Sequence, residues 1–425
     1  MEKTVYESFI KILEEELVPA TGCTEPIAVA YAAALARDTL GALPYETVAE
    51  VSGNILKNVK SVVVPNTGGL RGIESAVAAG IVAGNAEKRL DVLADIKAND
   101  LEKIRAYIEK AHCTVQKSHS QCVFDIGITV KSGEHSAYVR ITKHHTNVVR
   151  IERDGAALLS KDEGENEQSA IVRDSLTIKN IIAFANELKT NDIAAVIKRQ
   201  IACNTAISDE GLKNDYGGRV GKTLLAAFGS GVHNRAKAAA AAGSDARMNG
   251  CSLPVVIVSG SGNQGMTASL PVIEYAKELG ASEEQLIRAL AVADLITVRL
   301  KSGIGKLSAY CGAVSAGCGA GAGVCYLCGG DYDAVSHTVI NALAINSGIL
   351  CDGAKSSCAA KIASAVDAGL LGYEMYRNGN MFYGGDGILD SDVEKTIDNV
   401  GDIARIGMHE TDEQIVNLMI EGCCK

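Results

Sequence analysis

The sequence is poor in aromatic residues and in positive charge. It has no Trp and only 5 Phe, so its cores must be built from Ala, Val, Ile and Leu, while 44 Gly allow elements to pack closely. Lys and Arg number 41 against 51 Asp and Glu, which gives a formal net charge of −10. This balance argues against a general nucleic-acid-binding function, because binding to phosphates needs a basic surface.

A strongly apolar run of membrane-spanning length is also missing. Residues 1–19 carry charges throughout and lack an apolar h-region, so we expect no signal peptide. The uncharged segment 307–330 consists mainly of Gly, Ala, Ser and Cys, which favours a buried helix or glycine-rich loop over a membrane span. We therefore expect a cytoplasmic protein with no membrane partner. The 13 Cys then stay reduced and serve as ligands, reactive thiols or packing residues.

The pattern along the chain changes near its middle, and 425 residues are enough for two domains. Apolar residues at helical spacing predict early helices at 4–18, 27–41 and 73–85. A strand is expected at 57–65, and the residues at 112–153, rich in Val, Ile, Thr and Tyr, predict an antiparallel meander. Polar residues 160–170 are the predicted linker.

Helical patterns dominate after this linker. They are expected at 175–189, 191–204, 283–301 and 361–378. We therefore predict an α+β N-terminal domain, residues 1–160, made of helices plus an antiparallel meander. A mainly α-helical C-terminal domain, residues 171–425, follows it.

Three cysteines of the C-terminal half lie in segments rich in Gly, Ala and Ser. These are Cys311, Cys351 and Cys358, in SAYCGAVSAG, GILCDGAKSS and GAKSSCAAKI. Small neighbours let the backbone approach a bulky inorganic group. Three thiolates without an obvious fourth are what an iron–sulfur cluster with one open iron needs. Such a cluster is a Lewis acid, so the pattern indicates an enzyme.

Cys23 lies in the turn ATGCTEP, directly before a predicted helix with Pro26 in its first turn. Free backbone N–H groups and the helix dipole at that position favour a thiolate over a thiol. The sequence therefore predicts a thiolate of low pKa that serves as a base, a nucleophile or a metal ligand. A small residue that merely precedes a helix explains the position equally well.

The segment SGSGNQG, from Ser259 to Gly265, follows an apolar run and precedes a predicted helix. Its backbone amides and the side chains of Asn263 and Gln264 suit an anion such as a substrate carboxylate. Its glycine spacing alone is weak support for a dinucleotide site, because no βαβ unit surrounds it. PNTGG, at 65–69, and KHHTN, at 143–147, are weaker candidates that a tight turn and an exposed strand end would also explain.

Taken together, these segments resemble the L-cysteine desulfidase family, iron–sulfur relatives of bacterial L-serine dehydratase. ATGCTEP, PNTGG, SGSGNQG, SAYCG and CDGAKSSC occur in the family's order over almost the whole chain. The helical half resembles the dehydratase α domain and the α+β half resembles its β domain. The chain lacks the prolines of the dehydratase cluster segment and carries Cys23 where the dehydratase has a Ser-rich turn, and both differences favour the desulfidase.

The resemblance implies a 4Fe–4S cluster held by Cys311, Cys351 and Cys358, with one iron outside this set, and no pyridoxal phosphate (PLP). It implies a carbon–sulfur lyase that converts L-cysteine to hydrogen sulfide, pyruvate and ammonia, with Cys23 as the base. The small amino-acid substrate is expected to contact the turn residues Thr24, Asn66, Thr67, His144, Ser259, Ser261, Gly262, Asn263 and Gln264.

Several alternatives stay open at this stage. L-serine or another β-substituted amino acid would suit the same chemistry, and a non-catalytic iron–sulfur redox sensor is a hypothesis of another class. The sequence does not say whether Cys23, Cys423 or Cys424 holds the fourth iron at rest. It also allows, without requiring, a homo-oligomer.

Overall fold

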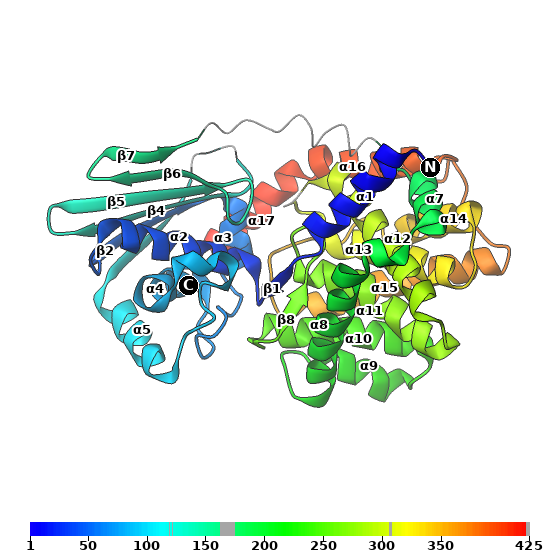
Figure 1. Cartoon of the computed structure of the whole chain (residues 1–425), viewed down its shortest axis with the longest axis horizontal. Coiled ribbons are helices and arrows are strands. Elements are labelled where there is room, and N and C mark those ends of the chain that lie inside the picture. The colour runs from blue at the N-terminus through cyan, green and yellow to red at the C-terminus, as the bar shows by residue number, and fades with distance from the viewer. Residues whose placement is uncertain (119, 121, 162–174, 306–307, 422–425) are drawn as a thin grey trace.

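The computed structural model describes the chain except residues 119, 121, 162–174, 306–307 and 422–425, and for residues 420 and 421 it describes the backbone alone. Its elements form an α+β half and a helical half that lie next to each other (Figure 1). Each half has its own hydrophobic core. The predicted fold class, an α+β N-terminal part followed by a mainly helical C-terminal part, is confirmed.

The α+β half is a six-stranded sheet with helices packed on one face (Figure 1). Its strand order is β3-β2-β4-β5-β6-β7, and only the β2–β3 pair is parallel. The strands are β2 (Glu46–Val51), β3 (His112–Lys117), β4 (Asp125–Ser132), β5 (His135–Thr142), β6 (Val148–Arg153) and β7 (Ala156–Ser160). The helical segments are α2 (Thr24–Leu40), α3 (Gly53–Val59), α4 (Gly72–Ala83), η1 (Ala86–Asp91) and α5 (Ala98–Lys110).

The helical half is built around α13 (Gly312–Leu327), which is buried along almost its whole length. Its small residues let neighbouring backbones come close: a side chain on Gly317 would lie 2.2 Å from the Ala365 carbonyl oxygen. The other elements are α7 (Ile178–Glu187), η2 (Thr190–Asp192), α8 (Ala194–Lys213), α9 (Val220–Phe228), α10 (Val232–Met248), α11 (Gly262–Leu279), α12 (Glu283–Ile304), α14 (Tyr332–Ile345), α15 (Cys358–Arg377), α16 (Val393–Asp402), η3 (Ile403–Gly407) and α17 (His409–Glu421).

Both ends of the described chain cross to the opposite half (Figure 1). The first helix, α1 (Lys3–Glu16), packs Phe9 and Leu13 into the core of the helical half, with the Phe9 ring centroid 5.4 Å from that of Phe184. At the other end, α17 packs on α3, where Asp412 forms an ion pair with the buried Lys57. The division into domains 1–160 and 171–425 stays a prediction, and these crossings tie the two parts together.

A two-stranded antiparallel sheet also joins the halves. Strand β1 (Pro19–Thr21) pairs with β8 (Pro254–Val256), and Thr21 lies opposite Pro254. Because Cys23 follows β1 directly and Ser259 follows β8 closely, this pairing draws the two predicted substrate turns toward one place.

The sequence predictions for individual elements had mixed outcomes. The helix expected at 27–41 is confirmed as α2, which ends at Gly41 in the left-handed conformation (φ 78°). The meander is confirmed in β4–β6, and β7 extends it beyond the predicted residues. β3 instead pairs in parallel with β2, a strand that the sequence analysis did not predict. The strand at 57–65 was wrong: α3 occupies its start because Ser52 accepts a hydrogen bond from the Ile55 N–H and begins a helix there.

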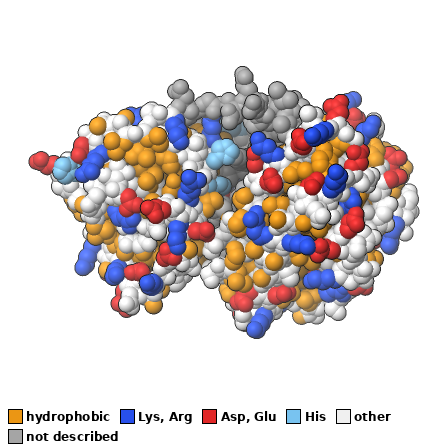
Figure 2. All heavy atoms as spheres, in the orientation of Figure 1, with side chains coloured by type: hydrophobic (Ala, Val, Ile, Leu, Met, Phe, Trp, Pro, Cys, Tyr) orange, Lys and Arg blue, Asp and Glu red, His pale blue; other side chains and the backbone are white. Residues whose placement is uncertain are grey.

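The remaining predictions concern the linker and the membrane. Most of the expected linker at 160–170 lies outside the described residues. The segment 307–330 contributes the buried helix α13, as expected. Within the described chain, we find no helix with the length and apolarity that a membrane crossing requires. Basic and acidic side chains are mixed over the visible face, whose outline is indented between the two halves (Figure 2).

Candidate active site

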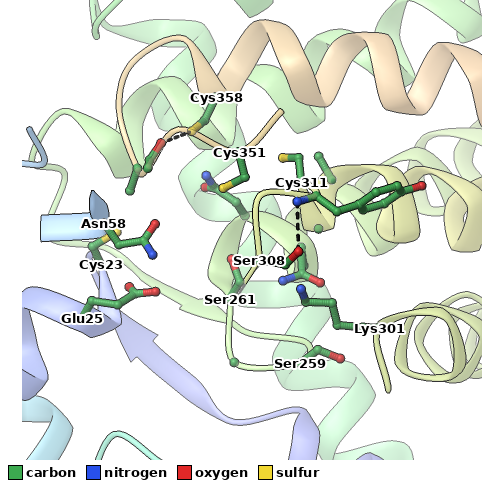
Figure 3. A pocket seen from close by; sticks show the side chains of 18 of the residues that line it. Cys23, Glu25, Asn58, Ser259, Ser261, Lys301, Ser308, Cys311, Cys351 and Cys358 are labelled. Carbon is green, nitrogen blue, oxygen red and sulfur yellow. Dashed lines mark hydrogen bonds between the residues drawn. The ribbon is translucent and has the colours of Figure 1, made fainter. Parts of the chain in front are cut away.

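A cavity of about 120 Å³ is lined by residues of both halves. The α+β half contributes Cys23, Glu25 and Asn58, and the helical half contributes Cys311, Cys351 and Cys358 among others. Figure 3 shows the first group on one side of the cavity and Cys311 and Cys351 well away from it, across the open space. Residues separated by more than 300 positions in the sequence therefore share one site.

Cys311 and Cys351 are held side by side by backbone hydrogen bonds. The Cys311 N–H donates to the Ile349 carbonyl at 2.8 Å, and the Cys351 N–H donates to the Ala309 carbonyl at 2.6 Å. Tyr310 and Leu350 form the bridge between the two segments. The two thiols are consequently close enough to share a hydrogen bond.

Cys358 is the first residue of α15, and its Sγ lies 3.8 Å from the Gly353 carbonyl oxygen (Figure 3). Gly353 adopts a positive φ of 94°, and a side chain there would lie 2.1 Å from the Lys57 carbonyl oxygen. The glycine therefore lets the loop between Cys351 and Cys358 pack against α3 of the other half. This contact is a second reason, besides room for an inorganic group, for a glycine beside the cysteines.

Four helices begin at this cavity. Cys23 precedes α2, Ser261 precedes α11, Cys311 precedes α13, and Cys358 opens α15. The N-terminus of a helix carries unpaired N–H groups and a partial positive charge. The cavity is therefore an environment that favours negative charge, such as thiolates, sulfide or a carboxylate.

Two buried lysines add positive charge beside the cysteines. Lys57 comes from α3 and Lys301 from α12, and both act electrostatically on Cys351. The hydrogen bond from Cys311 and these two charges lower the pKa of Cys351. Burial lowers the pKa of Lys301 to about 8, although the nearby Cys351 and Cys311 raise it. A buried thiolate is thus stabilised on the wall that carries the three cysteines.

This wall fits a 4Fe–4S cluster. The three expected ligands are all thiols, they face one cavity, and nearby positive charge offsets the negative charge of a thiolate-ligated cluster. No group of three or more His, Cys, Asp or Glu in the described chain is arranged to hold a single metal ion.

Cys23 is 3% exposed, and Cys358 packs against the small apolar cluster that Cys23 forms with Val62 and Met248, whereas Cys311 and Cys351 lie across the open space (Figure 3). Gly22 (φ 65°) turns the chain here against Pro65, which a side chain at position 22 would approach to 2.2 Å. The prediction of a low pKa for Cys23 was wrong for the chain alone. Burial raises the pKa of this thiol to about 12, although the charge of Arg247 lowers it. The loss of solvation therefore raises the pKa of Cys23 by more than the helix N-terminus lowers it.

The structure brings only part of the predicted substrate set to the cavity. Ser259, Ser261, Asn263 and Gln264 line it. Gly262 is the first residue of α11, packed against Arg247, so this helix begins earlier than expected.

The other predicted contacts do not line the cavity. Thr24 donates a hydrogen bond to the Gly260 carbonyl at 3.3 Å, which joins the two turns behind the site. Asn66 donates to the Leu93 carbonyl and Thr67 to the Val64 carbonyl, so both stabilise their own loop. His144 does not line the cavity, whereas its neighbour His145 does.

Sequence reasoning missed several lining residues that carry charge or a polar group. They are Glu25, Asn58, Arg247, Lys301 and Tyr310. Arg247 and Lys301 lie within long helices whose sequence pattern gives no sign that the positions are buried. A charged residue among small ones, as in AAAAAGSDARM, was the only available signal for Arg247.

A thiol-lined, buried cavity at the junction of an α+β half and a helical half is the arrangement of a small-molecule enzyme site. The sequence profile described as serine dehydratase alpha chain matches residues 87–417. The chain therefore belongs to the serine dehydratase alpha chain family. The match begins in η1, so it includes the strands β3–β7 as well as the helical half.

Relatives of similar length carry the name UPF0597 protein. The one from Desulfitobacterium hafniense is 53% identical over 419 residues, which cover 98% of this chain and 97% of the relative. Relatives from Lachnoclostridium phytofermentans and Treponema denticola are 49% and 44% identical, covering 98% and 99% of this chain and 100% and 99% of their own lengths. The likeness therefore extends over both halves.

Proposed function

We propose that this protein is a PLP-independent iron–sulfur lyase that converts L-cysteine to hydrogen sulfide, pyruvate and ammonia. The observation that carries the proposal is a cavity lined by Cys311, Cys351, Cys358 and Cys23, in which Cys23 lies across the open space from Cys311 and Cys351 (Figure 3). The membership of the serine dehydratase alpha chain family supports a lyase of the iron–sulfur type.

In this proposal Cys311, Cys351 and Cys358 hold a 4Fe–4S cluster, and Lys57 and Lys301 offset its charge. When bound, the cluster supplies Lewis-acid chemistry at one iron, which makes the β-substituent of the substrate a better leaving group. The N-terminus of α11, with Ser261 and Asn263, presents N–H groups and a side-chain amide to the substrate carboxylate.

Cys23 is the proposed base. Its Sγ takes the Cα proton, the Cα–H electrons form the Cα–Cβ double bond, and the Cβ–S bond breaks to release sulfide. The resulting aminoacrylate tautomerises to an imine, and water hydrolyses the imine to pyruvate and ammonia. A thiol whose pKa is raised by burial is a strong base once ionised, and the adjacent Arg247 stabilises that thiolate.

L-serine is the second candidate substrate, because the family profile bears the name of serine dehydratase. The same residues would then remove water instead of hydrogen sulfide. The discriminating feature is the leaving group alone, so the two candidates share every residue of the site.

The test uses anaerobically purified protein with L-cysteine and L-serine in parallel. We expect sulfide and pyruvate in equal amounts from L-cysteine, with a higher kcat/KM than for L-serine. Cys23→Ala should lose turnover, while Cys203→Ala, a thiol on α8 that does not line the cavity, should keep it. Pyruvate from L-serine without sulfide from L-cysteine would favour the second candidate. Turnover of neither amino acid, with the iron retained, would favour a redox sensor and end the lyase proposal.

A further inference from the structure

Two side chains of opposite charge flank Cys23 in the cavity. Arg247 lies in the last turn of α10 in the helical half, and Glu25 lies in the first turn of α2 in the α+β half. Both line the cavity, and both are close enough to change the pKa of Cys23 by their charge. An L-amino acid in water carries the same two charges on either side of its Cα.

Arg247 is a buried cation that lies beside the Cys23 thiol and has no carboxylate partner among the described residues. It is 3% exposed, and it forms no ion pair with any carboxylate in the described parts of the chain. Its Nη1 donates to the Asn263 Oδ1 at 3.2 Å, and its Nε has no hydrogen-bond partner. Burying a guanidinium in this way is costly unless an anion completes its hydrogen bonds. The planar donor fork suits a carboxylate.

Glu25 is the matching anion. One of its carboxylate oxygens accepts a hydrogen bond from the Thr24 hydroxyl at 3.1 Å, and the group is directed into the cavity (Figure 3). Among the described residues no Lys or Arg pairs with it, although Arg247 lines the same cavity. A carboxylate at this position can accept hydrogen bonds from an ammonium group.

We infer that Arg247 and Glu25 recognise the substrate as a zwitterion, with Arg247 binding the α-carboxylate and Glu25 the α-ammonium. The inference rests on the proposed function and assigns the site to α-amino acids rather than to hydroxy acids or simple thiols. With both groups held, Cα lies against the Cys23 Sγ between them. The β-substituent is then directed to the wall of the three cysteines.

Three fixed points also imply that the site distinguishes enantiomers. When the carboxylate, the ammonium and the β-substituent are each bound, only one enantiomer turns its Cα–H toward Cys23. The other enantiomer either loses one contact or directs the hydrogen away from the base. A difference in kcat/KM of about 10- to 150-fold between the two enantiomers of cysteine is expected, because a lost charge-assisted contact costs about 1.5–3 kcal/mol.

The test separates the two contacts with two partial substrates. 3-Mercaptopropionate has the thiol and the carboxylate but no ammonium, and cysteamine has the thiol and the ammonium but no carboxylate. Their dissociation constants, and that of L-cysteine, are measured by calorimetry on anaerobic, cluster-loaded protein. A Cys23→Ala background prevents consumption of L-cysteine.

Arg247→Gln should weaken L-cysteine and 3-mercaptopropionate about 10- to 100-fold and leave cysteamine unchanged. Glu25→Gln should weaken L-cysteine and cysteamine by a similar factor and leave 3-mercaptopropionate unchanged. Arg247→Lys, which keeps the charge, should recover part of the loss for 3-mercaptopropionate. Matched controls are Arg235→Gln on α10 and Glu283→Gln in the first turn of α12, neither of which lines the cavity.

Equal losses for both partial substrates, or no loss for either, would overturn the inference. If the expected pattern appears while the wild-type protein releases neither sulfide nor pyruvate, the proposed function fails and zwitterion recognition stands. If turnover is normal and the pattern is absent, only the inference fails. Circular dichroism melting curves for each variant show whether a lost affinity reflects unfolding instead.

Discussion

The two walls of the cavity carry different chemistry. The helical half supplies Cys311 directly before α13, Cys351 in the loop after Leu350, and Cys358 at the start of α15. The α+β half supplies Cys23, which directly precedes α2, and Glu25, which lies in the first turn of that helix. One wall is suited to hold a metal cluster, and the other is suited to hold and deprotonate a small molecule. The comparison teaches that neither half contains a complete site.

The contacts that join the halves therefore also position the residues of the candidate site. The β1–β8 pairing fixes Cys23 near the turn of Ser259 and Ser261. The ion pair between Lys57 and Asp412 fixes α3 against α17, and Lys57 also acts on Cys351 across the junction. A change at this junction should affect both walls, whereas a change on one wall should affect one function.

The largest expected effect comes from the wall of three cysteines. Cys351→Ala should remove the cluster, because the remaining thiols of Cys311 and Cys358 are too few to hold it, and activity should fall to background. Iron and acid-labile sulfide per chain measure the effect after anaerobic reconstitution. Cys325→Ala, a buried thiol of α13 outside the cavity, is the control. Full iron content in Cys351→Ala would show that the assignment of this wall is wrong.

Replacement of Cys23 should separate cluster binding from activity. Cys23→Ala should keep its iron and lose about 10²- to 10⁴-fold in kcat, as expected for the removal of a general base. The KM for L-cysteine should change little, since Arg247 and Glu25 remain. Loss of iron together with activity in this variant would remove the distinction between the walls.

The junction itself is tested by Asp412→Asn. Removal of one partner of a buried ion pair leaves the buried Lys57 charge uncompensated, and we expect a loss of about 3 kcal/mol in the free energy of unfolding. Denaturant titration of the protein measures this loss. Asp402→Asn, whose ion pair with Arg405 is exposed, should change stability by less than about 1 kcal/mol. Equal effects in the two variants would contradict a stabilising role of the junction.

Each half contains a buried carboxylate, and the two differ in their partners. The pH dependence of the free energy of unfolding should reveal this difference. Burial raises the pKa of Asp294 on α12 to about 7. Its stabilising contribution is complete below the unfolded pKa of about 3.9 and is lost as pH rises through the folded value. Asp294→Asn should therefore raise the free energy of unfolding at pH 8, by on the order of 1–2 kcal/mol, and change it little at pH 4.

Asp125 in the sheet is the counterpart. It is buried and receives a hydrogen bond from the Arg140 Nε at 2.8 Å, so Asp125→Asn should destabilise the protein at pH 8. Thermal melting of both variants at pH 4 and pH 8 makes the comparison. A destabilised Asp294→Asn at pH 8 would mean that this carboxylate is ionised and compensated in the folded protein.

Local sequence patterns predicted the elements whose structure depends on neighbours in the chain. The helix that ends at Gly41 and the buried helix α13 follow from spacing and small residues. The strand β2 and the helix α3 were missed, because their apolar residues are few and their structure depends on β4 and on the Ser52 cap. Short segments with mixed patterns are decided by tertiary contacts.

Prediction of the site residues from the sequence has the same limit, because some of them are identified only by tertiary contacts. Cys23 and the three other cysteines were legible because thiols are rare and distinctive, and the structure places all four around one cavity. Arg247 and Glu25 were not, since an arginine or glutamate in a helix is ordinarily exposed. The pKa of Cys23 could not be predicted from its helix terminus, because burial depends on Val62 and Met248, which pack against it from distant segments.

The most direct test of the account is an iron and sulfide determination with an optical spectrum on anaerobically purified wild-type protein, before and after addition of L-cysteine. The account predicts about four irons and four sulfides per chain, a brown protein, and a spectral change when the amino acid is added. A colourless preparation that contains no iron and still releases sulfide and pyruvate at the full rate would contradict it.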